Sequence, residues 1–220
     1  MSSTNQPPAE EQLFVSDGLE AELFWQKYRK AILLGAAALV VALAAVALWF
    51  VNTYNARLAA EALFANAGNP EEWREVIAKY PASAQAADAW FLVAESLREQ
   101  GDIAQSTESY QKFLNAFPDH PLAGGARLGI AENLELAGKS TEALTALRDV
   151  KTRDAGSYAA AYAALLEGRI FLREGRLDEA SKVFSTLVST DSQSPAARVA
   201  GMQLDAIQPL LVVEPKKAAQ

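Results

Sequence analysis

Cysteine is absent from the 220-residue sequence, and histidine occurs only once. Without cysteine the chain can form neither a disulfide framework nor a thiolate site, although this absence is compatible with an envelope protein and a cytosolic one alike. Basic residues are in the minority, with 20 Lys and Arg against 27 Asp and Glu. The net charge of −7 offers no basic footprint for phosphates, so we expect no nucleic-acid partner.

Motifs of common catalytic sites are also missing. The chain has no Gly-rich phosphate loop, no GxSxG and no HExxH. The one histidine, His120, lies in a Phe-Pro-Asp-His-Pro turn, where Asp119 beside it supplies at most half of a metal site. Serines such as Ser140 lack a histidine to activate them. We therefore predict that the protein is not an enzyme and takes no cofactor, metal or small-molecule substrate.

A long apolar run near the N-terminus is the strongest positive signal. Residues 31–51 contain no charged side chain, and a helix of this length matches the hydrocarbon core of a bilayer. Basic residues cluster immediately before the run, whereas only Arg57 follows it closely, which places the N-terminus in the cytoplasm. The sequence thus predicts a single-pass inner-membrane protein with a cytoplasmic tail over 1–30 and a periplasmic domain after residue 51. Membrane lipid is then a partner of this one helix.

A cleavable signal peptide is the alternative interpretation of the run. Its apolar core would be roughly 7–15 residues, shorter than this one, and the Trp-Phe-Val-Asn sequence that follows makes a poor cleavage site. A buried helix of a soluble domain would rarely be apolar on all faces over this length. In the tail, Asp17 can cap a short juxtamembrane helix. That helix either extends the anchor along the membrane surface or docks a cytoplasmic partner.

Three glycines recur every 37 residues in the part that follows the run. Gly101, Gly138 and Gly175 each stand between two helical patterns, which is typical of a turn that joins two antiparallel helices. One such pair cannot bury its own apolar face, so successive pairs are expected to stack. Small residues that let the paired helices approach closely recur at Ala94, Ala131 and Gly168 and at Ser106, Ala143 and Ala180, and bulky ones recur at Tyr110, Leu147 and Phe184.

These residues resemble the pattern of the tetratricopeptide-repeat (TPR) family. The first unit carries the resemblance with Trp90-Phe-Leu-Val-Ala94, Leu97, Gly101-Asp102, Ser106, Tyr110, Phe113 and Pro118. The second unit departs from it at Arg127, in place of Trp90, and the third unit at Glu167, which stands at a normally apolar position. The period is also longer than the family's usual one of about 34 residues.

The predicted fold is all-α, with one N-terminal transmembrane helix over 31–51 followed by a TPR-like α-solenoid of antiparallel helix pairs over 52–210. A half-repeat containing Trp73 and Val76 precedes the pairs, and Met202, Ala206 and Leu210 are expected to form the apolar face of a final capping helix. The repeats are predicted at about 86–118, 123–155 and 160–192, the capping helix at 195–210, and a flexible tail at 211–220.

The family resemblance also implies a protein-binding groove on the concave side. Carried onto this chain, the groove positions fall on three residues of the first helix in each repeat. They are Phe91, Glu95 and Arg98 in the first repeat, Leu128, Glu132 and Glu135 in the second, and Leu165, Arg169 and Leu172 in the third. The other interpretation is that several of these side chains pack against neighbouring helices.

The whole layout is similar to the YfgM-type family of ancillary Sec-translocon subunits. The stretches over 166–175 and 201–207 carry this resemblance, together with the short cytoplasmic lead and the single anchor. It implies a scaffold whose partners are translocon subunits and a membrane-anchored periplasmic chaperone for newly exported proteins. The alternatives are a TPR adaptor in outer-membrane or cell-wall assembly and a self-associating structural protein of the envelope.

Overall fold

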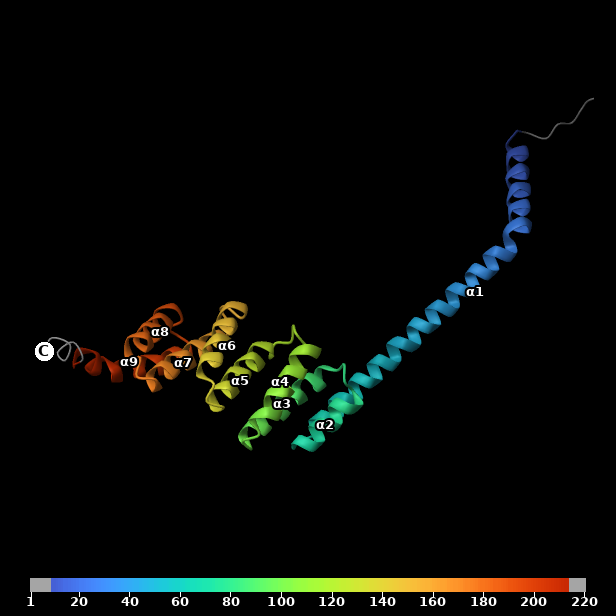
Figure 1. Ribbon diagram of the computed structural model, residues 1–220. Helices are drawn as coiled ribbons and strands as arrows, with labels where there is room; N and C mark the ends of the chain where they lie inside the picture. The colour runs from blue at the N-terminus through green and yellow to red at the C-terminus, as the bar shows by residue number, and fades with distance from the viewer. Residues whose placement is uncertain (1–8, 214–220) are drawn as a thin grey trace, which may run out of the picture. The chain divides into compact units, whose positions relative to one another are not determined.

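The computed structural model describes the backbone of residues 9–213 and the side chains of residues 22–210. Within this range the chain consists of helices joined by short turns, with no strand, so the predicted all-α fold class is confirmed (Figure 1). The helices are α1 (Ala9–Ala65), α2 (Pro70–Lys79), α3 (Ala84–Glu99), α4 (Ile103–Ala116), α5 (Ala123–Leu136), α6 (Ser140–Arg153), α7 (Tyr158–Arg173), α8 (Leu177–Thr190) and α9 (Pro195–Val213).

Helix α1 contains the apolar run. Its stretch Glu22–Ala65 is long and apolar enough to cross a membrane, and the most apolar window, with a mean hydropathy of 2.8, is not buried inside the protein. The juxtamembrane helix does not begin at Asp17, as the capping pattern predicts, because α1 already begins at Ala9 and continues into the apolar run. No proline interrupts the sequence between the two ends of α1, so the helix can continue without a break. Residues 1–8 of the predicted tail lie outside the described range.

The contacts divide the chain into two units, Met1–Arg57 and Leu58–Gln220. In the second unit, the turn glycines act as the sequence predicts. Gly101, Gly138 and Gly175 have φ of 82°, 76° and 74°, a region that glycine enters without strain. Each glycine ends the first helix of a pair, and the residue after it donates its N–H to a carbonyl of that helix. The pairs are α3–α4, α5–α6 and α7–α8, with α2 before them and α9 after them.

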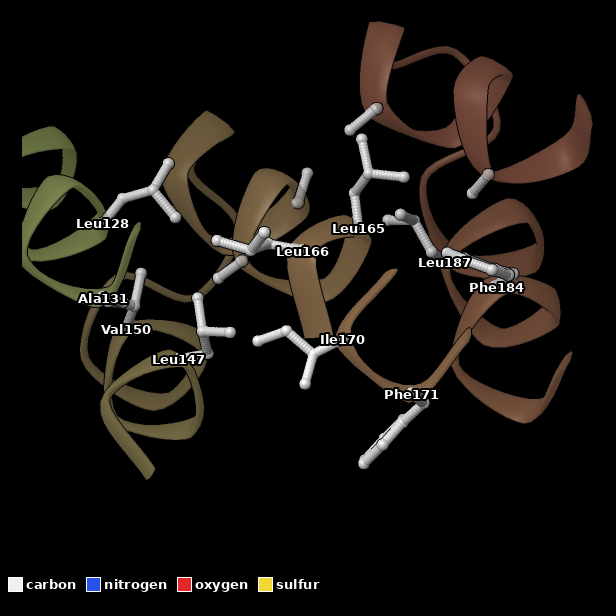
Figure 2. Packing of buried hydrophobic residues seen from close by; sticks show 14 of the residues in the cluster. Leu128, Ala131, Leu147, Val150, Leu165, Leu166, Ile170, Phe171, Phe184 and Leu187 are labelled. Carbon is white, nitrogen blue, oxygen red and sulfur yellow. The ribbon is translucent and has the colours of Figure 1, made fainter. Parts of the chain in front are cut away.

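The first helices of the pairs form a continuous inner row. Helix α3 contacts α5, α5 contacts α7 and α7 contacts α9, whereas in the described residues α4, α6 and α8 contact only their neighbours in the sequence. A row whose members also touch their second neighbours lies on the tighter, inner side of a solenoid. Buried side chains such as Leu147, Ile170 and Phe184 fill the space between the two rows (Figure 2).

The capping helix buries a different side from the one predicted. Met202 and Leu210 are 65% and 53% exposed, whereas Ala196, Ala200 and Ile207 are buried. Helix α9 contacts both α7 and α8, and small alanines let it approach them closely. The expected apolar face is therefore wrong. The helix also continues to Val213, so the predicted flexible tail begins as helix, and its remaining residues, 214–220, lie outside the described range.

Candidate interaction surface

Seven of the nine predicted groove residues are at least partly accessible on the inner row. Phe91, Glu95 and Arg98 are half-buried on α3, as are Glu132 and Glu135 on α5 and Leu172 on α7, and Arg169 of α7 is exposed. Leu128 and Leu165 are only 8% and 6% exposed, and both belong to the hydrophobic core. For these two leucines the groove prediction is wrong, because their side chains fill the space between neighbouring helices instead of facing solvent.

Three of the predicted groove residues hold the inner helices together. The Arg98 guanidinium on α3 bonds both Glu95 on the same helix and Glu132 on α5. The Tyr110 hydroxyl, from α4, donates to Glu95. Burial raises the pKa of Tyr110 well above its usual value, and the hydrogen bond to Glu95 adds to this effect. Burial also raises the pKa of the Glu132 carboxyl, although Arg98 opposes the shift.

A further ion pair continues this pattern along the row. Arg173 on α7 bonds Glu135 on α5, whose side chain is only 16% exposed. Arg169, by contrast, forms no ion pair with any described side chain. These ion pairs between inner helices stabilise the stacking of the repeats, and they form a polar frame along the inner row.

An aromatic surface lies within this polar frame, and two of its three members are not among the predicted groove residues. Tyr158 and Tyr162, one turn apart on α7, are 53% and 41% exposed. A Cβ atom on Gly125 of α5 would meet the Tyr158 hydroxyl at 2.3 Å and the Phe91 ring at 3.3 Å. The missing side chain at Gly125 thus lets Tyr158 reach across α5 towards Phe91 of α3. Phe91, Tyr158 and Tyr162 are called the aromatic surface below.

The environment of Tyr158 connects the aromatic surface to nearby charges. Burial raises the pKa of the Tyr158 hydroxyl, and the carboxylates of Asp154 and Glu95 raise it further. The signal that would have found this tyrosine is the Gly124-Gly125 pair, which is unusual inside a helix and indicates a close approach by another group. A surface of two exposed tyrosine rings and one half-buried phenylalanine ring, framed by fixed charges, is suited to recognition of another protein.

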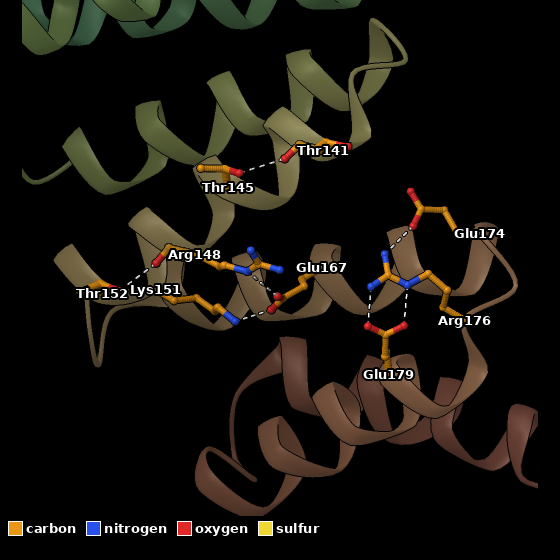
Figure 3. A network of polar contacts seen from close by, with 9 residues as sticks. All are labelled: Thr141, Thr145, Arg148, Lys151, Thr152, Glu167, Glu174, Arg176 and Glu179. Atoms are coloured by element: carbon orange, nitrogen blue, oxygen red, sulfur yellow. Dashed lines mark hydrogen bonds and ion pairs between the residues drawn. The ribbon is translucent and has the colours of Figure 1, made fainter.

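The departures of the second and third units from the family pattern are accommodated by ion pairs. Arg127 of α5 bonds Asp154, which follows α6, through two N–H···O contacts of 2.6 and 2.9 Å. Glu167 of α7 is buried, and it bonds Lys151 and lies 3.7 Å from Arg148, both from α6 (Figure 3). No group of three or more possible metal ligands occurs among the described side chains.

One curated relative is similar to less than half of the chain. A stretch of 100 residues, 44% of the chain, is 34% identical to part of the Cellulose synthase operon protein C of Xanthomonas axonopodis pv. citri (strain 306). The chain spans only 6% of the length of that relative. The similarity is therefore confined to a small part of a much longer protein.

The comparison with solved structures finds similarities at low sequence identity. The nearly identical TPR-like repeats of a Podosopora anserina protein assigned as a kinesin light chain superpose with a TM-score of 0.51 at 14% identity, covering 76% of this chain and 90% of that one. The MamA protein gives a TM-score of 0.46 at 16% identity, covering 68% and 78%.

A family model describes almost the whole chain. The model of the tetratricopeptide repeat-like domain matches residues 22–209, a range that includes the apolar part of α1 as well as the helix pairs. The pattern of turn glycines, small contact residues and stacked helix pairs agrees with this match. The chain therefore belongs to the tetratricopeptide repeat-like domain family.

Proposed function

We propose that the chain is a membrane-anchored scaffold that binds other proteins through the aromatic surface of its inner row. The observation that carries this proposal is the exposure of Tyr158 and Tyr162 on the inner row, where α5 contacts both α3 and α7 and where the Tyr158 hydroxyl and the Phe91 ring both lie close to Gly125. Solenoids use this side as an extended binding surface. Tyrosine supplies large contact area with few rotatable bonds, so it is well suited to anchor a partner.

The finer proposal concerns location and partners. We propose that α1 spans the inner membrane with the N-terminus in the cytoplasm and the repeats in the periplasm, which the basic residues before the apolar run support. Translocon subunits and a membrane-anchored periplasmic chaperone are the proposed partners, supported by the resemblance of the layout to the YfgM-type family. The second candidate is an adaptor in envelope assembly, favoured by the similarity to part of a cellulose synthase operon protein.

Protease treatment of spheroplasts tests the proposed topology. Added protease should digest the region after residue 57 and leave the membrane segment, because the repeats would face the outside of the inner membrane. In intact cells the protease should leave the protein uncut, whereas in detergent-lysed cells it should digest the regions on both sides of the membrane segment. If the repeats survive in spheroplasts and are cut only after lysis, the domain lies in the cytoplasm and the proposed orientation is wrong.

Site-specific photo-crosslinking tests the proposed binding surface. A photoreactive phenylalanine analogue in place of Tyr162 should give adducts with a translocon subunit or a chaperone, because this side chain is exposed within the aromatic surface. The matched control places the analogue at Thr145, which is exposed on the outer helix α6. Equal adducts at both positions would contradict the proposal. Adducts only between two copies of the chain would support the self-associating alternative instead.

A further inference from the structure

The three repeats differ at one position of the first helix. Trp90, Arg127 and Ala164 stand at the same place in successive repeats, 37 residues apart. In the first repeat, Trp90 packs against the local core and the Lys112 ammonium lies 5.5 Å from its ring centre. In the second repeat, Arg127 fills the place together with Asp154. In the third repeat, the methyl group of Ala164 is too small to fill this place.

A cleft occupies the corresponding place in the third repeat. It has a volume of about 570 Å³ and lies between α7, α8 and the end of α6. This volume falls within the range of about 300–1,000 Å³ that is typical of binding sites. A second side chain in the lining of the cleft is also smaller than its counterpart in the first repeat, because Leu187 stands where the first repeat has Phe113. We call this space the α7–α8 cleft.

The cleft is mainly apolar, and charged side chains of both signs stand at its edge. Its lining includes Ala160, Ala161, Ala164, Val183 and Leu187, together with the lysines Lys151 and Lys182 and with Asp191 at the end of α8. Lys151 bonds the buried Glu167, so its charge is already compensated. Lys182 forms no ion pair with any described side chain, and its ammonium is therefore available to an incoming group.

We propose that the α7–α8 cleft receives a tryptophan side chain from a partner protein, with acidic residues of the partner next to it. The first repeat provides the template, because Trp90 fills the same place there and lies against Lys112. Lys182 stands on α8 one helical turn before the position equivalent to Lys112. An indole ring would cover the alanines of α7 and gain a cation–π contact with Lys182. Acidic neighbours of the tryptophan would complement the same lysine. The residues of the cleft are distinct from the aromatic surface, so the inference does not depend on what that surface binds.

A fluorine-labelled peptide tests the proposal on the full chain in phosphatidylcholine nanodiscs. The probe is acetyl-Glu-Asp-(5-fluorotryptophan)-Asp-Glu-amide, and its ¹⁹F line should broaden with the wild-type protein and not with empty nanodiscs. Ala164→Trp fills the cleft from within, as Trp90 does in the first repeat, and should weaken binding about tenfold or more. The matched control is Ala104→Trp, which places a tryptophan at an exposed site on α4 and should leave binding unchanged.

A charge reversal gives an independent readout. Lys182→Glu changes a surface side chain without altering the packing, and it should weaken binding of the acidic peptide roughly three- to fivefold. An otherwise identical peptide with alanine in place of tryptophan should not compete with the probe. The proposal is overturned if Ala164→Trp binds as the wild type does, if the alanine peptide competes equally, or if empty nanodiscs produce the same broadening.

Discussion

Gly168→Ala is expected to lower the free energy of unfolding by about 1–3 kcal/mol, the usual cost of forcing extra volume into a packed core. A Cβ atom at Gly168 would lie 2.3 Å from the nearest ring atom of Phe184, and two further ring atoms lie within 2.8 Å. Phe184 is fully buried on α8, so its ring is surrounded by other protein atoms and can move away only if they shift. The strain would therefore fall on the contact between α7 and α8.

The second repeat supplies the compensating change. It has Ala131 and Leu147 at the positions of Gly168 and Phe184. Combining Gly168→Ala with Phe184→Leu should therefore restore part of the stability that Gly168→Ala loses. Denaturation of the full chain in detergent, followed by helical circular dichroism, measures both effects. Gly68→Ala is the matched control and should be neutral, because a Cβ there meets nothing within 4 Å. Strictly additive losses in the double variant would contradict this account.

The architecture of the repeats follows largely from local patterns in the sequence. The spacing of Gly101, Gly138 and Gly175 predicts the turns, and small residues recurring at the same period predict where the paired helices meet. Which neighbour a bulky residue packs against is not predictable in this way. The Tyr110 ring lies against Gly129 of the next repeat, whereas the Phe184 ring lies against a glycine of its own repeat. Which glycine a ring packs against depends on the distances and angles between neighbouring helices, and the 37-residue period alone does not determine these.

The proposed binding surface is predictable from the sequence only in part, for a related reason. The groove positions taken from the TPR family fall on α3, α5 and α7, which form the inner row. They do not show whether a given side chain faces solvent or a neighbouring helix. Leu128 and Leu165 are buried because they fill the space between adjacent helices. The Tyr158 hydroxyl can lie over α5, on the same side as the Phe91 ring, because Gly125 has no side chain. A glycine on one helix thus determines where a side chain of the next helix can lie.

The ion pair at Glu167 tests whether a polar residue at a normally apolar position stabilises the third repeat. The Glu167 side chain is only 6% exposed, and it bonds Lys151, while Arg148 is 3.7 Å away and largely exposed. Removing one partner of a buried pair leaves an uncompensated charge, at a cost of about 3–5 kcal/mol. Because Lys151 is one-third exposed, solvent reduces this cost, and we expect Lys151→Ala to lower the free energy of unfolding by about 2 kcal/mol.

Replacing the carboxylate itself should have a much smaller effect. Glu167→Leu removes the buried charge and restores an apolar residue, so its stability should be close to that of the wild type or above it. In the double variant, Glu167→Leu should recover most of what Lys151→Ala loses, because no buried charge is left without a partner. Lys79→Ala, which breaks an exposed pair with Glu75, is the control and should cost under about 0.5 kcal/mol. If Lys151→Ala costs as much in the Glu167→Leu background as in the wild type, the lysine acts through packing of its aliphatic stem, and the charge pairing is not what stabilises this repeat.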